Sequence, residues 1–165
     1  TTEDALANIG DVLQRARELA VQASNGTNTP SDMEKVKEEV DQLRNQIIHL
    51  ANTTYAGRYI FSGYETDKPL IDEATGNYAI GVSNSEAIKY QIGIGDDIDV
   101  NVTGGDLFSY GVYAVAGDKP KMVEVFEDFE LALQSGDHQA VSGVLAKLDE
   151  CIENVIKVRA DVGAR

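Results

Sequence analysis

MEKVKEEVDQLRNQIIHLANTT, residues 33–54, carries apolar side chains in alternating steps of three and four. The stripe consists of Met33, Val36, Val40, Leu43, Ile47 and Leu50, and it closes on the polar Thr54. Steps of three and four return to one face of an α-helix at every turn, so the stretch predicts a long helix with one buried face. Ser31, two residues before this stretch, and Glu34 within it match the S-x-x-E capping box. The match predicts Ser31 as the N-cap of the helix.

The same spacing recurs near both ends of the chain. The first stripe is Leu6, Ile9, Leu13, Ala16, Ala20 and Ala23, and the last is Val141, Val144, Leu148, Cys151, Val155, Val158 and Val162. Asn25-Gly26 predicts the end of the first helix, because glycine readily adopts the left-handed conformation past a helix end. Three helices of similar length with such stripes predict a long antiparallel helical bundle with coiled-coil-like packing.

A shorter helix is predicted ahead of the last long one. It carries Met122, Phe126, Phe129 and Leu133 on one face. Ser135-Gly136-Asp137 predicts a helix stop followed by a new N-cap. We interpret all four apolar faces as the core of the bundle, which requires no cofactor.

Residues 64–117 differ from the rest of the chain, because glycine, tyrosine and alternating isoleucine and valine replace the charged helical pattern. Period-two alternation at 88–92 and 98–102 predicts half-buried strands, and Thr75-Gly76-Asn77 predicts a turn before a strand at 78–82. The sequence therefore predicts an α+β fold, in which residues 1–63 plus 118–165 form a discontinuous bundle domain. Residues 64–117 form a small, mostly antiparallel β domain inserted into it. Its own core is expected to consist of Ile80, Val82, Ile88, Ile92, Ile98, Val100 and Val102.

The composition limits the classes of partner. With 28 acidic against 14 basic residues, the net charge of −14 repels phosphate backbones, so nucleic acid is not expected as a partner. No apolar run approaches the roughly 20 residues that cross a bilayer, so no membrane partner is expected either.

The single cysteine, Cys151, lies in an apolar stripe and is predicted to be an inert core residue. The chain starts without Met inside a helical pattern, which indicates a fragment.

Motifs for chemistry are weak. Asp97–Asn101 begins like a calcium loop, but Val102 and Phe108 stand where such a loop needs glycine and glutamate, so a strand is the better interpretation. The two histidines, His49 and His138, have no triad or metal-ligand spacing around them and are expected on the surface. We therefore predict no catalytic, cofactor-binding or metal-binding residue, and no enzyme activity.

Two stretches resemble bacterial flagellins and their relatives. Residues 17–27, RELAVQASNGT, resemble the end of their first helix, and residues 158–165, VRADVGAR, resemble the entry into their C-terminal helix. A third stretch is more specific, since residues 57–66, GRYIFSGYET, look like the signature of the hook-associated protein 3 family of the flagellin superfamily. The similarity continues through residues 69–78 and returns at residues 101–108.

The resemblance implies a flagellin-like core fold and a structural role at the hook–filament junction of the bacterial flagellum. Members of the family form a ring of identical subunits between the first hook-associated protein and the flagellin filament. They are exported unfolded by the flagellar type III apparatus, with an export chaperone as a further partner, and are therefore secreted and extracellular. Because the terminal segments that drive polymerisation are missing, the fragment itself is expected to be monomeric.

The same resemblance suggests where the bundle ends. Tyr59, Ile60 and Phe61 are predicted to form a short strand whose aromatic side chains dock on the bundle, with Gly57 and Gly63 as bends.

Two alternatives remain open. The chain could be a flagellin filament subunit. It could also be a ligand-binding module, with Tyr64, Tyr78, Tyr90, Tyr110 and Tyr113 as stacking faces. Exposed tyrosines gathered in a pocket would favour the binding module, whereas tyrosines buried in a core would argue against it.

Overall fold

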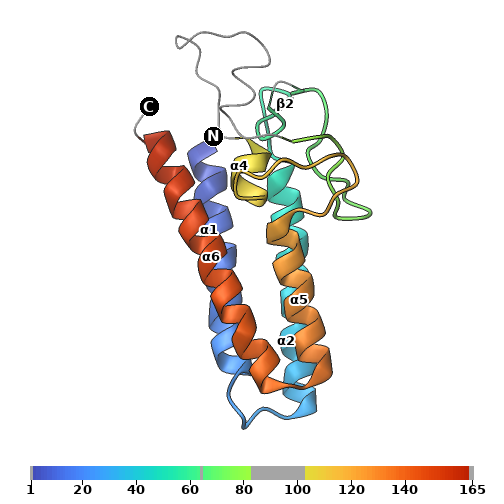
Figure 1. The fold of residues 1–165 in the computed structure, drawn as a ribbon, viewed down its shortest axis with the longest axis vertical. Coiled ribbons are helices and arrows are strands. Elements are labelled where there is room, and N and C mark those ends of the chain that lie inside the picture. The colour runs from blue at the N-terminus through green and yellow to red at the C-terminus, as the bar shows by residue number, and fades with distance from the viewer. Residues whose placement is uncertain (1, 64, 83–102, 164–165) are drawn as a thin grey trace.

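The computed structural model describes residues 2–63, 65–82 and 103–163. Helices α1 (Thr2–Ala23), α2 (Pro30–Ala51), α5 (Lys121–Ser135) and α6 (His138–Gly163) form an antiparallel bundle. In it, α1 contacts α2 and α6, and α5 contacts the same two helices (Figure 1). Helix α1 begins and α6 ends at the same end of the bundle, and the short connections α1–α2 and α5–α6 lie at the other. The bundle predicted from the apolar stripes is confirmed.

The predicted stripes form the core of this bundle. Every member of the α1 stripe is buried, and Ala5, Val12 and Leu19 widen the buried face beyond it. In α6 the stripe is buried from Val141 to Val158, and only Val162 is half-buried. Such wide apolar faces are expected where a helix packs against two neighbours.

The start of α2 differs from the prediction. Thr29, and not Ser31, is the N-cap: its hydroxyl accepts a hydrogen bond from the Asp32 backbone N–H at 3.1 Å, and Asp32 Oδ2 accepts one from the Thr29 N–H at 3.0 Å. Pro30 explains the shift. Proline has no N–H to satisfy and a φ already suited to the first helical position, so the cap falls on the residue before it.

This correction gives a test. Thr29→Ala should lower the free energy of unfolding by about 0.5–2 kcal/mol, because it leaves the Asp32 N–H without its acceptor. Ser31→Ala, two residues away inside the helix, should change stability by less than about 0.5 kcal/mol. Urea denaturation of both variants would measure the difference, and a larger loss from Ser31→Ala would contradict the assignment.

The end of α2 also differs from the prediction. The helix stops at Ala51, and Thr54 lies in β1 (Thr54–Tyr55), which pairs antiparallel with β2 (Arg58–Tyr59). Ala56 and Gly57 connect the two strands with φ of 53° and 79°. Positive φ at both central residues is the geometry of a two-residue hairpin turn whose twist matches its strands. The helix therefore ends shortly before the chain reverses at Ala56 and Gly57, with β1 beginning three residues after Ala51.

The predicted strand at residues 59–61 is only partly correct. Tyr59 belongs to β2, but Ile60 and Phe61 lie in the following turn. The expected docking of the aromatics holds for Phe61, which is 1% exposed. The bends at Gly57 and Gly63 are confirmed by their φ of 79° and 64°.

The described part of residues 64–117 is less β-rich than predicted. The turn at Gly76 is present, but the strand at 78–82 is reduced to two isolated bridges, Ile71 with Tyr78 and Val82 with Ala114. A short helix, α4 (Gly104–Phe108), lies in this segment, for which the sequence predicted no helix. Its N-cap Thr103 accepts a hydrogen bond from the Asp106 N–H at 3.1 Å, a capping pattern that the sequence analysis overlooked. The strands predicted at 88–92 and 98–102 lie outside the described residues.

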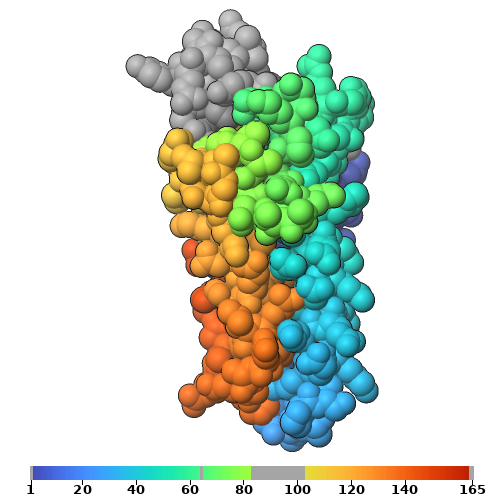
Figure 2. Space-filling view, turned by 90° about the vertical axis from the view of Figure 1, so that its right-hand side faces the viewer, coloured from blue at the N-terminus to red at the C-terminus, as the bar shows by residue number. Residues whose placement is uncertain are grey.

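The described part of this segment packs on the bundle. Ile80 and Val82, expected in a separate core, belong to the same buried cluster as the bundle residues. The five other residues expected in that core lie outside the described residues. The space-filling view shows residues 65–82 and the chain after α4 side by side over the ends of α2 and α5 (Figure 2). The division into two domains remains a proposal.

Candidate functional site

One amide side chain, that of Asn52, fixes a loop to the end of α2. Asn52 Oδ1 accepts hydrogen bonds from the backbone N–H groups of Leu70 at 3.0 Å and Ile71 at 2.9 Å. Its Nδ2 donates to the Ile71 carbonyl at 2.7 Å. Asn52 is the C-cap of α2, so these bonds fix the loop of residues 65–78 to the helix end. The sequence analysis gave this residue no role.

Apolar contacts complete this attachment. The rings of Phe61 and Phe108 lie edge to face with centroids 5.9 Å apart, and both side chains are buried. Leu70 packs so closely beneath Gly104 that a Cβ there would lie 2.4 Å from Leu70 Cδ2. Glycine at this position therefore allows α4 to approach the loop, because any larger residue would overlap with Leu70.

Hydrogen bonds join α4 and the chain after it to α6. Asn154 Nδ2 donates to the carbonyls of Asp106 and Leu107 at 3.0 and 3.1 Å. The Tyr110 hydroxyl lies 2.7 Å from the Sγ of Cys151. Burial raises the pKa of the Cys151 thiol to about 11, so at neutral pH it is protonated and a weak nucleophile. This confirms Cys151 as a core residue.

The tyrosines considered for ligand stacking do not share a surface. Tyr78 is 2% exposed and its hydroxyl bonds to that of Ser109 at 2.5 Å, whereas Tyr113 is 67% exposed. Tyr110 is half-buried, and burial raises its pKa, as it does that of Tyr78. Tyr64 and Tyr90 lie outside the described residues. The three described tyrosines therefore form no common stacking pocket.

The histidines also lie apart. His49 has a side chain that is 84% exposed, with the carboxylate of Glu73 4.0 Å away. His138 is half-buried at the start of α6, where its Nδ1 lies 3.2 Å from the Ala23 carbonyl. Within residues 2–63, 65–82 and 103–163, no three His, Cys, Asp or Glu side chains are placed to hold a metal ion. No helix in the same ranges is long and apolar enough to span a bilayer.

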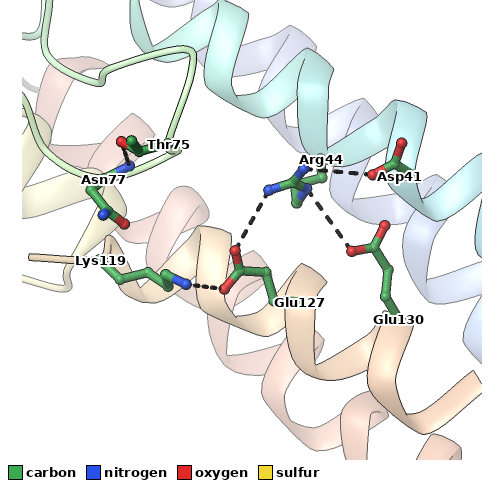
Figure 3. Close-up of polar contacts among 7 residues, drawn as sticks. All are labelled: Asp41, Arg44, Thr75, Asn77, Lys119, Glu127 and Glu130. Atoms are coloured by element: carbon green, nitrogen blue, oxygen red, sulfur yellow. Dashed lines mark hydrogen bonds and ion pairs between the residues drawn. The ribbon is translucent and has the colours of Figure 1, made fainter. Parts of the chain in front are cut away.

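A charged cluster lies between α2 and α5. Arg44 of α2 points toward Glu127 and Glu130 of α5, at 3.5 and 4.0 Å, and toward Asp41 on its own helix at 3.6 Å (Figure 3). Lys119 forms an ion pair with the other oxygen of Glu127. Burial and a hydrogen bond to Asp41 raise the pKa of Glu130 to about 7, although the charges of Arg44 and Lys37 oppose the shift. The cluster joins two helices but leads to no cavity with a reactive group.

The raised pKa of Glu130 predicts a pH-dependent stability. The pKa of Glu130 is 4.5 in the unfolded chain and about 7 in the folded protein. Its protonated form therefore stabilises the folded state fully at pH values below 4.5, and this stabilisation is lost as the pH rises through about 7. Glu130→Gln stays neutral at every pH. The variant should therefore gain stability over the natural protein as the pH rises from 4.5 to 8, which melting temperatures would show.

Glu34→Gln, on the exposed face of α2, is the matched control. It measures the effect of removing one exposed carboxylate from a helix over the same pH range. A Glu130→Gln difference that does not change with pH would contradict the assigned pKa shift.

Two exposed ion pairs cross between α1 and α6. Arg17 Nε lies 2.7 Å from Asp149 Oδ1, and Arg159 binds Glu3 Oε1 through two nitrogens at 2.8 and 3.0 Å. All four side chains are at least 42% exposed, and ion pairs of this kind each contribute only about 0–1 kcal/mol. Stability therefore comes chiefly from the apolar core.

The described surface also carries scattered large apolar side chains. They are Val21, Tyr55, Val112, Tyr113, Val115, Leu131 and Ile156. Three of them lie in the chain between α4 and α5, at the same end of the bundle as the Asn52 contacts. These exposed side chains are available for contact with a partner.

Known proteins with similar sequences are flagellar. The family of bacterial flagellin N-terminal helical regions matches residues 1–66. Flagellar hook-associated protein 3 of Escherichia coli is 31% identical over 180 aligned positions, which cover 99% of this chain and 56% of that protein. Flagellin of Salmonella typhimurium is 29% identical over 95% of this chain and 30% of its own length. The chain thus spans about half the length of the hook-associated relatives that it matches.

Solved structures share the fold. FlgL of Xanthomonas campestris superposes with a TM-score of 0.74 over 98% of this chain and 85% of that one, at 17% identity. The flagellar junction protein FlgL of Legionella pneumophila gives a TM-score of 0.64 over 99% and 88%, at 16% identity.

Proposed function

We propose, because this chain is a homologue of flagellar hook-associated protein 3 within the flagellin superfamily, that it is a structural subunit of the bacterial flagellum at the junction between hook and filament. The observation that carries the proposal is the alignment of nearly the whole chain with hook-associated protein 3. Of the GRYIFSGYET stretch, residues 57–63, 65 and 66 lead from the end of α2 and β1 into the loop of residues 65–78. Phe61 of this stretch takes part in attaching the loops, because its buried ring packs on that of Phe108.

The structure supports a mechanical rather than a chemical role. The bundle core is continuous from α1 to α6, and the loops above it are tied to α2 by Asn52 and to α6 by Asn154. The only thiol is buried and protonated at neutral pH. A part that must keep its shape while transmitting force needs such a packed interior and stable surface contacts, and it needs no reactive group.

The proposed partners follow from this location. They are copies of the same protein in a ring, the first hook-associated protein on the hook side and flagellin on the filament side. Export through the flagellar type III apparatus, with a chaperone, would deliver the protein to the extracellular flagellum. That the 165-residue chain alone is monomeric remains a prediction, which sedimentation at micromolar concentration would check.

A flagellin filament subunit is the second candidate. The observation in its favour is the alignment of Salmonella typhimurium flagellin with almost the whole chain. The ligand-binding module is not favoured, because Tyr78 is buried in the core and Tyr110 is half-buried against α6.

Immunogold electron microscopy would distinguish the two flagellar functions. Antibodies against the 165-residue chain would be applied to flagella of the source organism. Gold confined to the point where the hook meets the filament is expected for a junction subunit. Gold along the filament would show a flagellin, and intact flagella without gold would contradict both. Flagella from a strain lacking the gene are the control for antibody specificity.

A further inference from the structure

The turn between α1 and α2 contains the only Asn-Gly pair of the chain, Asn25-Gly26. Both residues are exposed, and they lie in the connection between Ala23 and Pro30 at the closed end of the bundle. Helix α1 ends at Ala23, just before this pair, but Gly26 does not have the left-handed φ that the sequence predicted for it. The hydrogen bonds of the Asn25 side chain bear on the reactivity of its amide group.

Two donors converge on the side-chain oxygen of Asn25. The backbone N–H of Thr27 and the hydroxyl of Thr27 both donate to Asn25 Oδ1, each at 3.1 Å. Hydrogen bonds to an amide oxygen polarise the carbonyl and stabilise the negative charge that develops on the oxygen when a nucleophile attacks the carbon. The two donors of Thr27 therefore hold the Asn25 carbonyl polarised in one fixed orientation.

The adjacent backbone nitrogen is available as the nucleophile. The N–H of Gly26 makes no hydrogen bond within the described part of the chain. A Cβ built at Gly26 would meet no atom within 4 Å, so the turn is open around it. With no side chain of its own, glycine also leaves the backbone free to approach the amide carbon.

We propose that Asn25 is a site of spontaneous deamidation, assisted by the two donors of Thr27. The Gly26 nitrogen attacks Asn25 Cγ, the new N–Cγ bond closes a succinimide, and the Cγ–Nδ2 bond breaks. The proton of the Gly26 N–H leaves with the amide nitrogen as ammonia. Water then opens the ring at either carbonyl and gives aspartate or isoaspartate, with no oxidant or cofactor.

Asn52 provides an internal comparison. Its Oδ1 also accepts two backbone N–H groups, so its carbonyl is polarised in the same way. The next nitrogen, however, belongs to the β-branched Thr53 and is bound to the Leu50 carbonyl at 3.1 Å. The structure therefore assigns the reaction to Asn25 and predicts that Asn52 keeps its amide.

The reaction would change the end of α1 in two ways. A carboxylate at position 25 places negative charge near the negative end of the helix dipole, which is unfavourable. Isoaspartate would also add a methylene to the backbone of the turn, where the Asn25 carbonyl now accepts hydrogen bonds from the N–H and Nδ2 of Asn28. The modification would accumulate with age, since nothing in the sequence of steps reverses it.

The test is to incubate the 165-residue chain at neutral pH and 37 °C and follow residue 25 by peptide mapping and mass spectrometry. Aspartate and isoaspartate should accumulate at residue 25, while Asn52 remains unchanged. Thr27→Val keeps the shape of the side chain but removes the hydroxyl. It should slow the reaction by roughly two- to tenfold, the effect of losing one exposed hydrogen bond. Thr27→Ser keeps the hydroxyl and should react at close to the natural rate.

Circular dichroism would confirm that each variant keeps its helices, which is expected because the turn is exposed. The natural chain unfolded in urea measures the reaction without the folded turn. A folded chain that reacts more slowly than the unfolded one, or a Thr27→Val variant that reacts at the natural rate, would overturn the proposal.

Discussion

Replacing Leu148 by alanine is expected to lower the free energy of unfolding by about 2–5 kcal/mol. Leu148 lies in the middle of α6 and is 0% exposed. Removing its branched end loses the transfer free energy of the deleted groups and leaves a cavity, because packed helices collapse only partly around a gap. Chemical denaturation monitored by circular dichroism would measure the change.

Lys147→Ala is the matched control. Lys147 is the preceding residue, but it points away from the core and forms an exposed ion pair with Asp128 at 3.0 Å. Its loss should cost no more than about 1 kcal/mol. Equal losses for the two variants would mean that α6 is rotated relative to the structure.

Phe108→Ala is expected to have a comparable or larger effect, about 3–5 kcal/mol. The Phe108 ring belongs to α4, is fully buried and packs edge to face on the ring of Phe61. Its removal would open a cavity where the loops meet the bundle, so the whole protein should unfold at lower denaturant concentration in a single transition.

Tyr113→Ala controls for the loss of an aromatic ring. Tyr113 lies five residues further along and is 67% exposed, so its replacement should change stability by less than about 0.5 kcal/mol. An early transition confined to the loops, with the helices melting as in the natural protein, would contradict the single-core prediction for Phe108→Ala. That result would support the proposed division into two domains.

The long helices could be predicted because apolar side chains recur at every third or fourth position along them. In α6 six buried side chains follow steps of three and four, and neither strands nor turns have that period. The start and the end of α2 were predicted wrongly because both are determined by local residues and not by the spacing of apolar side chains. Pro30 moves the start, and the hairpin turn at Ala56-Gly57 cuts off the end.

The loops above the bundle were harder to predict, because their structure depends on partners distant in sequence. Alternating Ile and Val near Tyr78 are compatible with a strand, but the backbone there bonds to loop residues, such as the Asp118 carbonyl, and forms only single bridges. Asn52 acquires its role only when Leu70 and Ile71 reach it. A short polar motif such as Thr103 to Asp106 could have revealed α4, since it is an N-cap signal.

The arrangement of α1 and α6 has a consequence for how the protein folds. The two helices are neighbours in space but come from opposite ends of the chain, and the ion pair of Arg159 with Glu3 closes a loop of 156 residues. The pairs α1–α2 and α5–α6 are joined by short connections and can form first, whereas the α1–α6 seam must await closure of almost the entire chain. We expect the seam to form after the rate-limiting step. Truncations along it should then speed unfolding and leave refolding rates nearly unchanged, which stopped-flow measurements would reveal.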